Sequence, residues 1–350
     1  MNSINPLQEH DTPSPLAFTL LRLLADGEFH SGEVLARQLG ISRASVSNAL
    51  RGMGSYGLTL YSVRGRGYCL SNPPQWLDAA RIASQLGEHG RHFWIDILDS
   101  APSTNTLLLQ RARLDAANKG AHSGSVLAVE WQSGGRGRMG RTWHSGLGNA
   151  LTFSLLWHFE CGLSALSGLS LATGVALMRA LNNLGVAGAR LKWPNDVVGV
   201  REHAKLAGTL IEVQGDMLGP SAVVIGIGLN LSFPQPVLRQ ISQPAVSLAE
   251  MVSEIPERNY LLAVLLRELH GVLREFAVHG FTALRAEWES YHAFQDQPVR
   301  VLLPDGNRVA DGIARGVTEN GMLKLETVQG IQFFNAGEVS LRSGAEYVAA

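Results

Sequence analysis

The residues best suited to chemistry in this chain of 350 residues lie in one stretch, Trp131 to Trp143. Between the two tryptophans the sequence reads Gln-Ser-Gly-Gly-Arg-Gly-Arg-Met-Gly-Arg-Thr, with four glycines and three arginines. Glycine lets backbone N–H groups approach a ligand closely, and guanidinium groups bind carboxylates and phosphates through paired hydrogen bonds. The stretch is therefore predicted to bind an anion, and phosphate is the first candidate.

Part of this stretch, Gly135 to Gly140, also matches the dinucleotide-binding pattern GxGxxG. In that fold a helix follows at once, because its N-terminus holds the pyrophosphate. Here the apolar runs 126–129 and 150–157, on either side of the loop, are typical of strands. The P-loop pattern is absent as well, because the sequence has no Gly-Lys pair. We therefore expect a loop between two strands that holds any nucleotide by another arrangement.

A second polar group, Ser103, Thr104 and Asn105, stands where a helix is predicted to begin. Free backbone N–H groups and hydroxyls at such a place can bind a carboxylate, a ureido carbonyl or a phosphate. Ordinary helix capping by Ser103 or Thr104 explains the same residues equally well. Both interpretations stay open on the sequence alone.

A third polar group surrounds a turn fixed by Pro194. Lys192, Asn195 and Asp196 supply a cation, an amide and a carboxylate, and Lys205 stands before the next predicted strand. Pro-Asn-Asp is also common in turns without any ligand, so a purely structural role is as probable as a site.

The apolar run 222–231 is predicted to be a strand that carries Gly226, Gly228 and Asn230. Glycines inside a strand usually mean that another group approaches the backbone closely. This strand is therefore expected to lie beside the site.

The N-terminal part is predicted to hold a helix-turn-helix, with helices over 32–39 and 43–53, followed by a hairpin around Arg64-Gly65-Arg66-Gly67. Five arginines and one glutamate lie between Ser31 and Tyr68, a charge of plus four that suits phosphate contacts. A winged module that makes only protein contacts is the alternative. The candidate DNA-contacting residues are Arg43, Ser47, Asn48, Arg51, Arg64 and Arg66.

Composition indicates an ordinary globular chain with a net charge of −1, in which only four of the 29 basic residues are lysine. Two distant cysteines argue against a disulfide framework or a zinc site, and neither a signal peptide nor an apolar run of 18 residues is present. A cytoplasmic protein without membrane contact is expected. The predicted segments are a flexible tail (1–15), a winged helix-turn-helix (16–72), a linker (73–90), an α/β domain (91–294) and a small β-barrel (295–345), with predicted helices over 75–86 and 164–184.

The order of these motifs resembles the bacterial family of bifunctional biotin ligases and biotin-operon repressors. The resemblance rests on Ser-Thr-Asn, Gln-x-x-Gly-Arg-Gly-Arg-x-Gly-Arg-x-Trp, Lys-Trp-Pro-Asn-Asp and Lys-Leu-Ala-Gly between a helix-turn-helix and a β-barrel. It extends from about Pro15 to Arg342. It implies an α/β (α+β) chain: a winged helix-turn-helix, a central mixed-sheet domain of the biotin/lipoate ligase type and an SH3-like barrel. Lipoate ligases share the fold class, but the Gly-Arg-Gly-Arg loop and the helix-turn-helix favour biotin.

The resemblance implies two-step chemistry. Biotin and ATP, with Mg²⁺, form biotinyl-5′-AMP, and a lysine of the biotin carboxyl carrier protein of acetyl-CoA carboxylase then takes the biotin. No metal-ligating residues are assigned. The implied catalytic residues are Arg136, Arg138 and Lys205; the implied biotin-binding residues are Ser103, Thr104, Asn105, Gln132, Arg136, Gly137, Arg138 and Lys205; and the implied nucleotide-binding residues are Arg138, Arg141, Trp143, Lys192, Asn195, Asp196 and Asn230.

The resemblance also implies regulation, in which biotinyl-5′-AMP is the corepressor and favours a homodimer through the central sheet that binds an operator with two half-sites. The arginine-rich loop is expected to be mobile without ligand and ordered with it. After its Ser-Arg-Ala opening the recognition helix departs from the family pattern, so no operator sequence carries over; the turn after Trp143 departs as well. Two alternatives remain: a ligase with an idle DNA-binding module, and a sensor that has lost catalysis.

Overall fold

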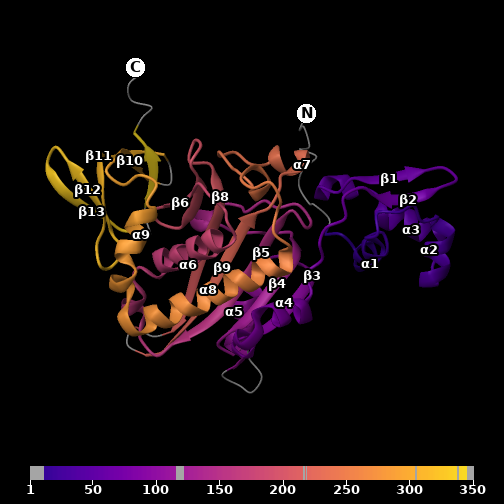
Figure 1. Ribbon diagram of the computed structural model, residues 1–350, viewed down its shortest axis with the longest axis horizontal. Coiled ribbons are helices and arrows are strands. Elements are labelled where there is room, and N and C mark those ends of the chain that lie inside the picture. Colours follow the sequence, from indigo (N-terminus) through magenta and orange to yellow (C-terminus); the bar gives the residue numbers. More distant parts are fainter. Residues whose placement is uncertain are drawn as a thin grey trace, which may run out of the picture.

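The computed structural model describes residues 12–115, 122–215, 217, 219–303, 306–336 and 339–344. Along its longest axis the N-terminal helices and hairpin lie at one end, the central sheet in the middle and the C-terminal strands at the other end (Figure 1). Most of the predicted tail, residues 1–11, falls outside the described residues, and Pro15 already opens the first helix.

Three short helices and a hairpin form the N-terminal domain. Serine caps each helix: the side chains of Ser14, Ser31 and Ser42 each accept a hydrogen bond from a backbone N–H of the first turn. The third helix ends earlier than predicted, at Leu50, because Arg51 is extended and Gly52 is left-handed. The elements are α1 (Pro15–Leu23), α2 (Gly32–Leu39), α3 (Arg43–Leu50), η1 (Met53–Tyr56), β1 (Leu60–Val63) and β2 (Gly67–Leu70).

A seven-stranded sheet forms the centre of the molecule, in the order β3-β4-β5-β9-β8-β7-β6. Of the strand pairs among the described residues of this sheet, only β3 and β4 are parallel, so the predicted mixed sheet is confirmed. The strands are β3 (Trp94–Ala101), β4 (Ser125–Gln132), β5 (Ala150–Phe159), β6 (Ala189–Lys192), β7 (Asp196–Gly199), β8 (Lys205–Gly215) and β9 (Ser221–Asn230).

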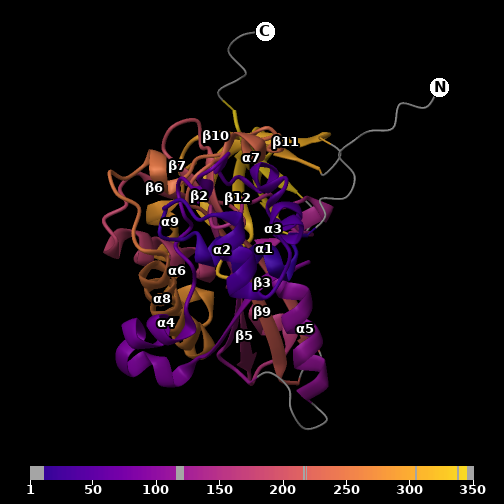
Figure 2. The same ribbon diagram turned by 90° about the vertical axis from the view of Figure 1, so that its right-hand side faces the viewer.

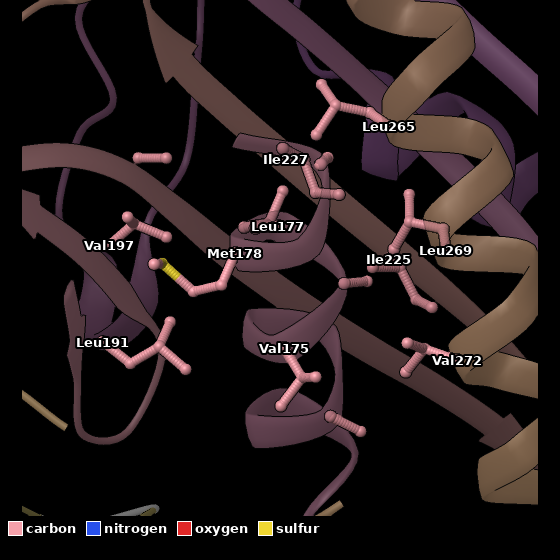
Figure 3. Close-up of a cluster of buried hydrophobic side chains, with 14 of the residues drawn as sticks. Val175, Leu177, Met178, Leu191, Val197, Ile225, Ile227, Leu265, Leu269 and Val272 are labelled. Atoms are coloured by element: carbon pink, nitrogen blue, oxygen red, sulfur yellow. The ribbon is translucent and has the colours of Figure 1, made fainter. Parts of the chain in front are cut away.

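The two faces of the sheet differ in what covers them. Figure 2 shows α5 on one side of β5 and β9, with α6 and α8 on the other. On β9, Ile225 and Ile227 pack with the main core under α6 and α8, which Figure 3 shows, while Val224 packs under α5. Gly226 and Gly228 therefore lie on the α5 face. The helices are α4 (Ala79–Leu86), α5 (Thr104–Asp115), α6 (Leu169–Asn183), α7 (Gln235–Leu238), α8 (Arg258–His279) and α9 (Arg285–Tyr291).

Two helix predictions need correction. The helix predicted over 164–184 is divided into η4 (Leu163–Leu166) and α6, because Gly168 between them is left-handed, and a side chain there would meet Phe281. This stretch is long and apolar enough to cross a membrane by composition, but α6 is largely buried between the sheet and α8, as a core helix is.

The helix predicted over 75–86 begins at Ala79, where the side chain of Asp78 caps it. Its residues Ile82 and Leu86 are buried in the main core, and α4 packs along α8. This part of the predicted linker 73–90 is therefore attached to the central domain and is not a free connection.

Five antiparallel strands form the C-terminal domain, in the order β13-β12-β11-β10-β14. Val299, Val301, Leu323 and Leu341 from these strands join the main core, so the domain packs firmly on the central one. The strands are β10 (Pro298–Leu302), β11 (Arg308–Val317), β12 (Leu323–Thr327), β13 (Gly330–Phe334) and β14 (Ser340–Ser343).

Candidate functional site

The glycine- and arginine-rich loop joins β4 to β5 and folds back on itself. Gly137 N–H donates to the carbonyl of Arg141 (2.7 Å), and Trp143 N–H donates to the carbonyl of Gly135 (2.9 Å). Only the single turn η3 (Arg138–Gly140) interrupts the loop before strand β5. No helix follows the GxGxxG pattern, so the prediction that this is not a dinucleotide-binding turn is confirmed.

A narrow cavity of about 50 Å³ lies on the α5 face of the sheet, beneath this loop. The lining residues are Ser103, Thr104, Asn105, Gln132, Arg136, Gly137, Arg138, Trp143, Thr152, Phe153, Asn195, Lys205, Gly208, Thr209, Leu210, Gly226, Ile227 and Gly228.

One end of the narrow cavity is polar but uncharged. Thr104 donates from its backbone N–H (2.8 Å) and its hydroxyl (3.2 Å) to Oε1 of Gln132. The hydroxyl of Ser154, which the sequence did not single out, donates to Oδ1 of Asn105 (2.5 Å), and its oxygen lies 2.7 Å from the hydroxyl of Thr104. Ser103 lines the cavity and also accepts a long hydrogen bond from Thr106 N–H (3.4 Å), so capping and cavity lining coexist.

The floor of the narrow cavity is glycine. A Cβ atom on Gly228 would overlap the indole ring of Trp143, and one on Gly226 would overlap the side-chain amide of Asn105. The prediction that another group approaches these two glycines closely is therefore confirmed.

Three cations line the narrow cavity, and each has a different partner. Lys205 Nζ lies 2.7 Å from Oδ1 of Asp196, and Arg136 Nη2 lies 2.7 Å from Oε2 of Glu212. Arg138 donates to neutral oxygens, Oδ1 of Asn195 (3.0 Å) and the carbonyl of Ala336. Burial is the main cause that lowers the pKa of Arg138, although nearby Asp196 opposes the shift.

A second, wide cavity of about 560 Å³ adjoins the first, because Trp143 and Lys205 line both. Arg342, from the last described strand, lines it too and gives it a positive wall. The ammonium of Lys205 lies 5.7 Å from the centre of the Trp143 ring, within cation–π range. The lining residues are Gly140, Arg141, Thr142, Trp143, His144, Lys205, Asn230, Ile241, Ser242, Gln243, Ala245 and Arg342.

Two predicted site residues, Lys192 and Asp196, line neither cavity. Asp196 reaches the site through its ion pair with Lys205. Burial, followed by the charge of Arg342, lowers the pKa of Lys192 to about 8, and Asp196 opposes this shift. Asn230 donates to the carbonyl of Lys205 (3.1 Å) and so holds that strand end in place.

The residues that sequence reasoning missed are Ser154, Thr152, Thr209, Glu212 and Arg342. Thr152 and Ser154 alternate with buried Leu151, Phe153 and Leu155 on β5, and this polar alternation in an apolar strand was the available signal. No local signal distinguishes Arg342 from the many other arginines, because a C-terminal strand brings it to the cavity. Within the described ranges no group of three or more His, Cys, Asp or Glu could hold a metal ion.

The predicted DNA-contacting residues are all exposed on the N-terminal domain. Val46 and Leu50 face its core, while Arg51 donates to Oδ1 of Asn48 (2.9 Å) on the outer face of α3. On the hairpin, the guanidinium of Arg66 stacks 3.9 Å from the ring centre of Phe29. The six exposed residues are Arg43, Ser47, Asn48, Arg51, Arg64 and Arg66.

Three segments of the chain match known families. Residues 97–230 match the Biotin/lipoate A/B protein ligase family, residues 17–69 match an HTH domain, and residues 296–342 match the Biotin protein ligase C terminal domain.

Similar proteins cover nearly the whole chain. The bifunctional ligase/repressor BirA of Salmonella typhimurium is 38% identical over 95% of this chain and 99% of its own length. The corresponding protein of Escherichia coli is 36% identical, over 93% and 96% respectively. The biotin–[acetyl-CoA-carboxylase] ligase of Mycobacterium tuberculosis is 32% identical over 76% of this chain and 96% of its own.

The fold is also similar to a solved structure, the biotin protein ligase from Aquifex aeolicus in complex with biotin and ATP. The TM-score is 0.57 and the identity 27%, and the match covers 71% of this chain and 99% of that chain. On the strength of the three matched segments and the full-length relatives, the chain belongs to the biotin protein ligase family, among the bifunctional ligase/repressor proteins.

Proposed function

We propose that the narrow cavity binds biotin and the wide cavity binds ATP, so that the two substrates meet at Lys205 and Trp143. The observation that carries this proposal is the shared wall of the two cavities, at which a cation stands. The uncharged polar end, with Thr104 and Gln132, suits the ureido ring of biotin, which both donates and accepts hydrogen bonds. The positive wall with Arg141 and Arg342 suits phosphates.

In the proposed first step, a carboxylate oxygen of biotin attacks the α-phosphorus of ATP. An O–P bond forms while the bond to the β-phosphate breaks, which releases pyrophosphate and leaves biotinyl-5′-AMP. Arg138 and Lys205 would stabilise the negative charge that gathers on the α-phosphate oxygens, and they hold two repelling anions together. Mg²⁺ would neutralise phosphate charge, and Asp196 is the carboxylate beside the site that fits such an ion.

In the proposed second step, the neutral amine of a lysine on the carrier protein attacks the acyl carbon of the adenylate. A C–N bond forms, the C–O bond to AMP breaks, and the amine gives up a proton. No protein nucleophile takes part, and the loop over the cavity would exclude water from the anhydride.

A direct test uses labelled biotin and ATP, followed by gel filtration and then addition of a biotin carrier domain. The expected result is label that stays with the protein as adenylate and moves to the carrier in a second phase. If labelled biotin binds but no pyrophosphate is released, the chain is a sensor that has lost catalysis, and the proposal fails.

We also propose that the adenylate-bound chain dimerises and binds operator DNA. The proposed dimer is supported by an unpaired edge of strand β8. β7 pairs only with residues 205–208 of β8, so among the described strands the outer half of β8 has a neighbour on one side alone. Two-fold pairing of such edges would give a dimer that carries two copies of α3, and an operator with two half-sites requires two such helices.

The DNA-binding proposal is tested by Arg43→Ala combined with Ser47→Ala, on the outer face of α3. A loss of operator affinity of about 10- to 100-fold is expected, with adenylate formation unchanged. Arg37→Ala on α2, where the arginine pairs with Glu33 (3.0 Å), is the matched control. Equal effects of both variants would contradict the assignment of α3 as the recognition helix.

A further inference from the structure

Glu212 is an acidic residue beside a pocket that would otherwise favour anions. It stands on β8, in the outer half that β7 does not cover, and its side chain is only 26% exposed. Its Oε2 accepts hydrogen bonds from Arg136 Nη2 (2.7 Å) and from Asn105 Nδ2 (2.9 Å). One carboxylate oxygen therefore joins the arginine-rich loop to the first turn of α5.

Glu212 does not line the narrow cavity itself. All the side chains that line the narrow cavity lie in the described ranges, and none of them is acidic. Glu212 instead pairs with Arg136, whereas the hydrogen bonds of Arg138 to other described residues go to neutral oxygens. This arrangement assigns different tasks to the two arginines: Arg138 is available to a ligand phosphate, and Arg136 holds the loop.

Asn105 makes this connection rigid. Its amide nitrogen also donates to the carbonyl of Leu210 (3.0 Å), and its Oδ1 accepts from Ser154. It lies directly over Gly226, which leaves no room for it to shift downward. The carboxylate of Glu212 is thus held at a fixed place, and through it the loop.

We propose that Glu212 is a positioning residue that fastens the arginine-rich loop over the narrow cavity through Arg136 and thereby sets how long the adenylate is retained. The inference rests on the proposed assignment of this cavity to biotin. The loop residues Arg136, Gly137 and Arg138 line the cavity, so opening the loop to release a ligand would separate the hydrogen-bonded ion pair between Arg136 and Glu212.

The test compares adenylate loss with adenylate formation. Glu212→Gln should release or hydrolyse prebound adenylate about tenfold faster in the absence of carrier, because Arg136 then donates to a neutral amide oxygen and the ion pair is lost. The first-turnover rate of pyrophosphate release should change by less than about threefold, since Glu212 does not touch the ligand. Asp96→Asn, which breaks a 2.7 Å ion pair with Arg111 outside both cavities, should change neither rate.

A charge swap keeps the inference falsifiable if a single variant is poorly folded. Arg136→Glu with Glu212→Arg should bring adenylate retention back to within about threefold of the wild type, whereas Arg136→Glu alone should not. The inference is overturned if Glu212→Gln retains adenylate normally, or if the swapped protein loses adenylate as fast as Arg136→Glu. Failure of pyrophosphate release in the wild type would instead contradict the proposed function.

Discussion

At the scale of single residues, the three cations that line the narrow cavity differ in their partners: among the described residues, Arg136 and Lys205 have acidic partners and Arg138 has none. Arg136 pairs with Glu212 and Lys205 pairs with Asp196, whereas Arg138 donates to an amide and a carbonyl oxygen. A half-buried guanidinium with neutral partners gains most when an anion binds. Arg138 is therefore expected to contribute most of the stabilisation of the α-phosphate.

Replacing Arg138 by alanine should slow adenylate formation by about 100-fold, the typical effect of removing one group that stabilises developing charge. The measurement is pyrophosphate release in a single turnover with saturating biotin and ATP. Arg111→Ala, far along α5, is the control and should keep the wild-type rate. An unchanged rate in Arg138→Ala would show that the site has been placed wrongly.

Lys192 is expected to lower the stability of the fold, because burial disfavours its charged form. Its folded-state pKa of about 8, lowered from 10.5 by burial, means that the folded chain releases this proton more readily than the unfolded chain. Below pH 8 both states carry the charge and the full cost is present; the cost falls as the pH rises from about 8 to 10.5.

Lys192→Met should therefore raise the free energy of unfolding at pH 7 by about 1–3 kcal/mol, with a smaller gain at pH 10. If the ammonium supports the triphosphate, the KM for ATP should rise in the same variant. The checks are thermal denaturation at both pH values and initial rates at varied ATP. A gain in stability that does not shrink with pH would contradict the buried-charge explanation.

At the scale of elements, successive side chains of β5 and β9 point to opposite faces of the sheet, and this alternation determines which residues face the site. On β9, isoleucines point to α6 and α8 while glycines line the cavity, and on β5 Thr152 lines it and Ser154, on the same face, contacts Thr104. Because Gly228 has no side chain, the Trp143 ring can lie directly against the backbone of β9. Two strands thus supply both the core and the shape of the pocket.

Gly228→Ala should push Trp143 off this floor, because the new methyl group overlaps the indole ring. We expect a loss of stability of about 1–3 kcal/mol and a clear loss of adenylate binding. Gly271→Ala, at an open position in helix α8, should instead be neutral or stabilising by up to about 1 kcal/mol. Urea denaturation and adenylate retention measure both effects, and wild-type binding by Gly228→Ala would contradict the role of the glycine floor.

Sequence patterns predicted most of these elements, because the signals that determine a helix or a strand lie within a few residues of it. The strands around the loop, helix α8 and the capped N-terminal helices follow from apolar periodicity and from serine, glycine and asparagine signals within a few residues. The ion pair of Arg136 with Glu212 joins residues 76 positions apart, and Arg342 arrives from another domain. Such contacts depend on tertiary packing, so no local pattern indicates them.

At the scale of the whole molecule, the N-terminal domain is packed against the catalytic one. The core of the helix-turn-helix includes Trp131 and Leu147, which flank the arginine-rich loop. Tyr56 meets Trp131 edge to face at 5.3 Å, and its carbonyl accepts a hydrogen bond from Leu147 N–H (2.9 Å). The arginine-rich loop is thus bounded on both sides by contacts to the helix-turn-helix domain.

Dimerisation through the outer half of β8 is a separate prediction. Val213 lies there with 42% of its surface exposed, and Val213→Asp should weaken ligand-dependent dimerisation by at least about tenfold by burying a charge in the interface. Operator binding should fall with it, while biotin transfer continues. Val278→Asp, at an exposed position of helix α8, is the control, and sedimentation velocity with and without adenylate is the measurement. Unchanged association of Val213→Asp would exclude this edge as the interface.

The central claim is that one adenylate serves both as the reactive intermediate of the ligase and as the signal for DNA binding. The most direct test is an electrophoretic shift on the biotin-gene promoters of the host, with biotin and ATP together or singly, beside transfer of labelled biotin to a carrier domain. We predict transfer together with a shift that requires both substrates and disappears when carrier domain consumes the adenylate. A shift that is independent of biotin and ATP, or transfer without any shift, would contradict the claim.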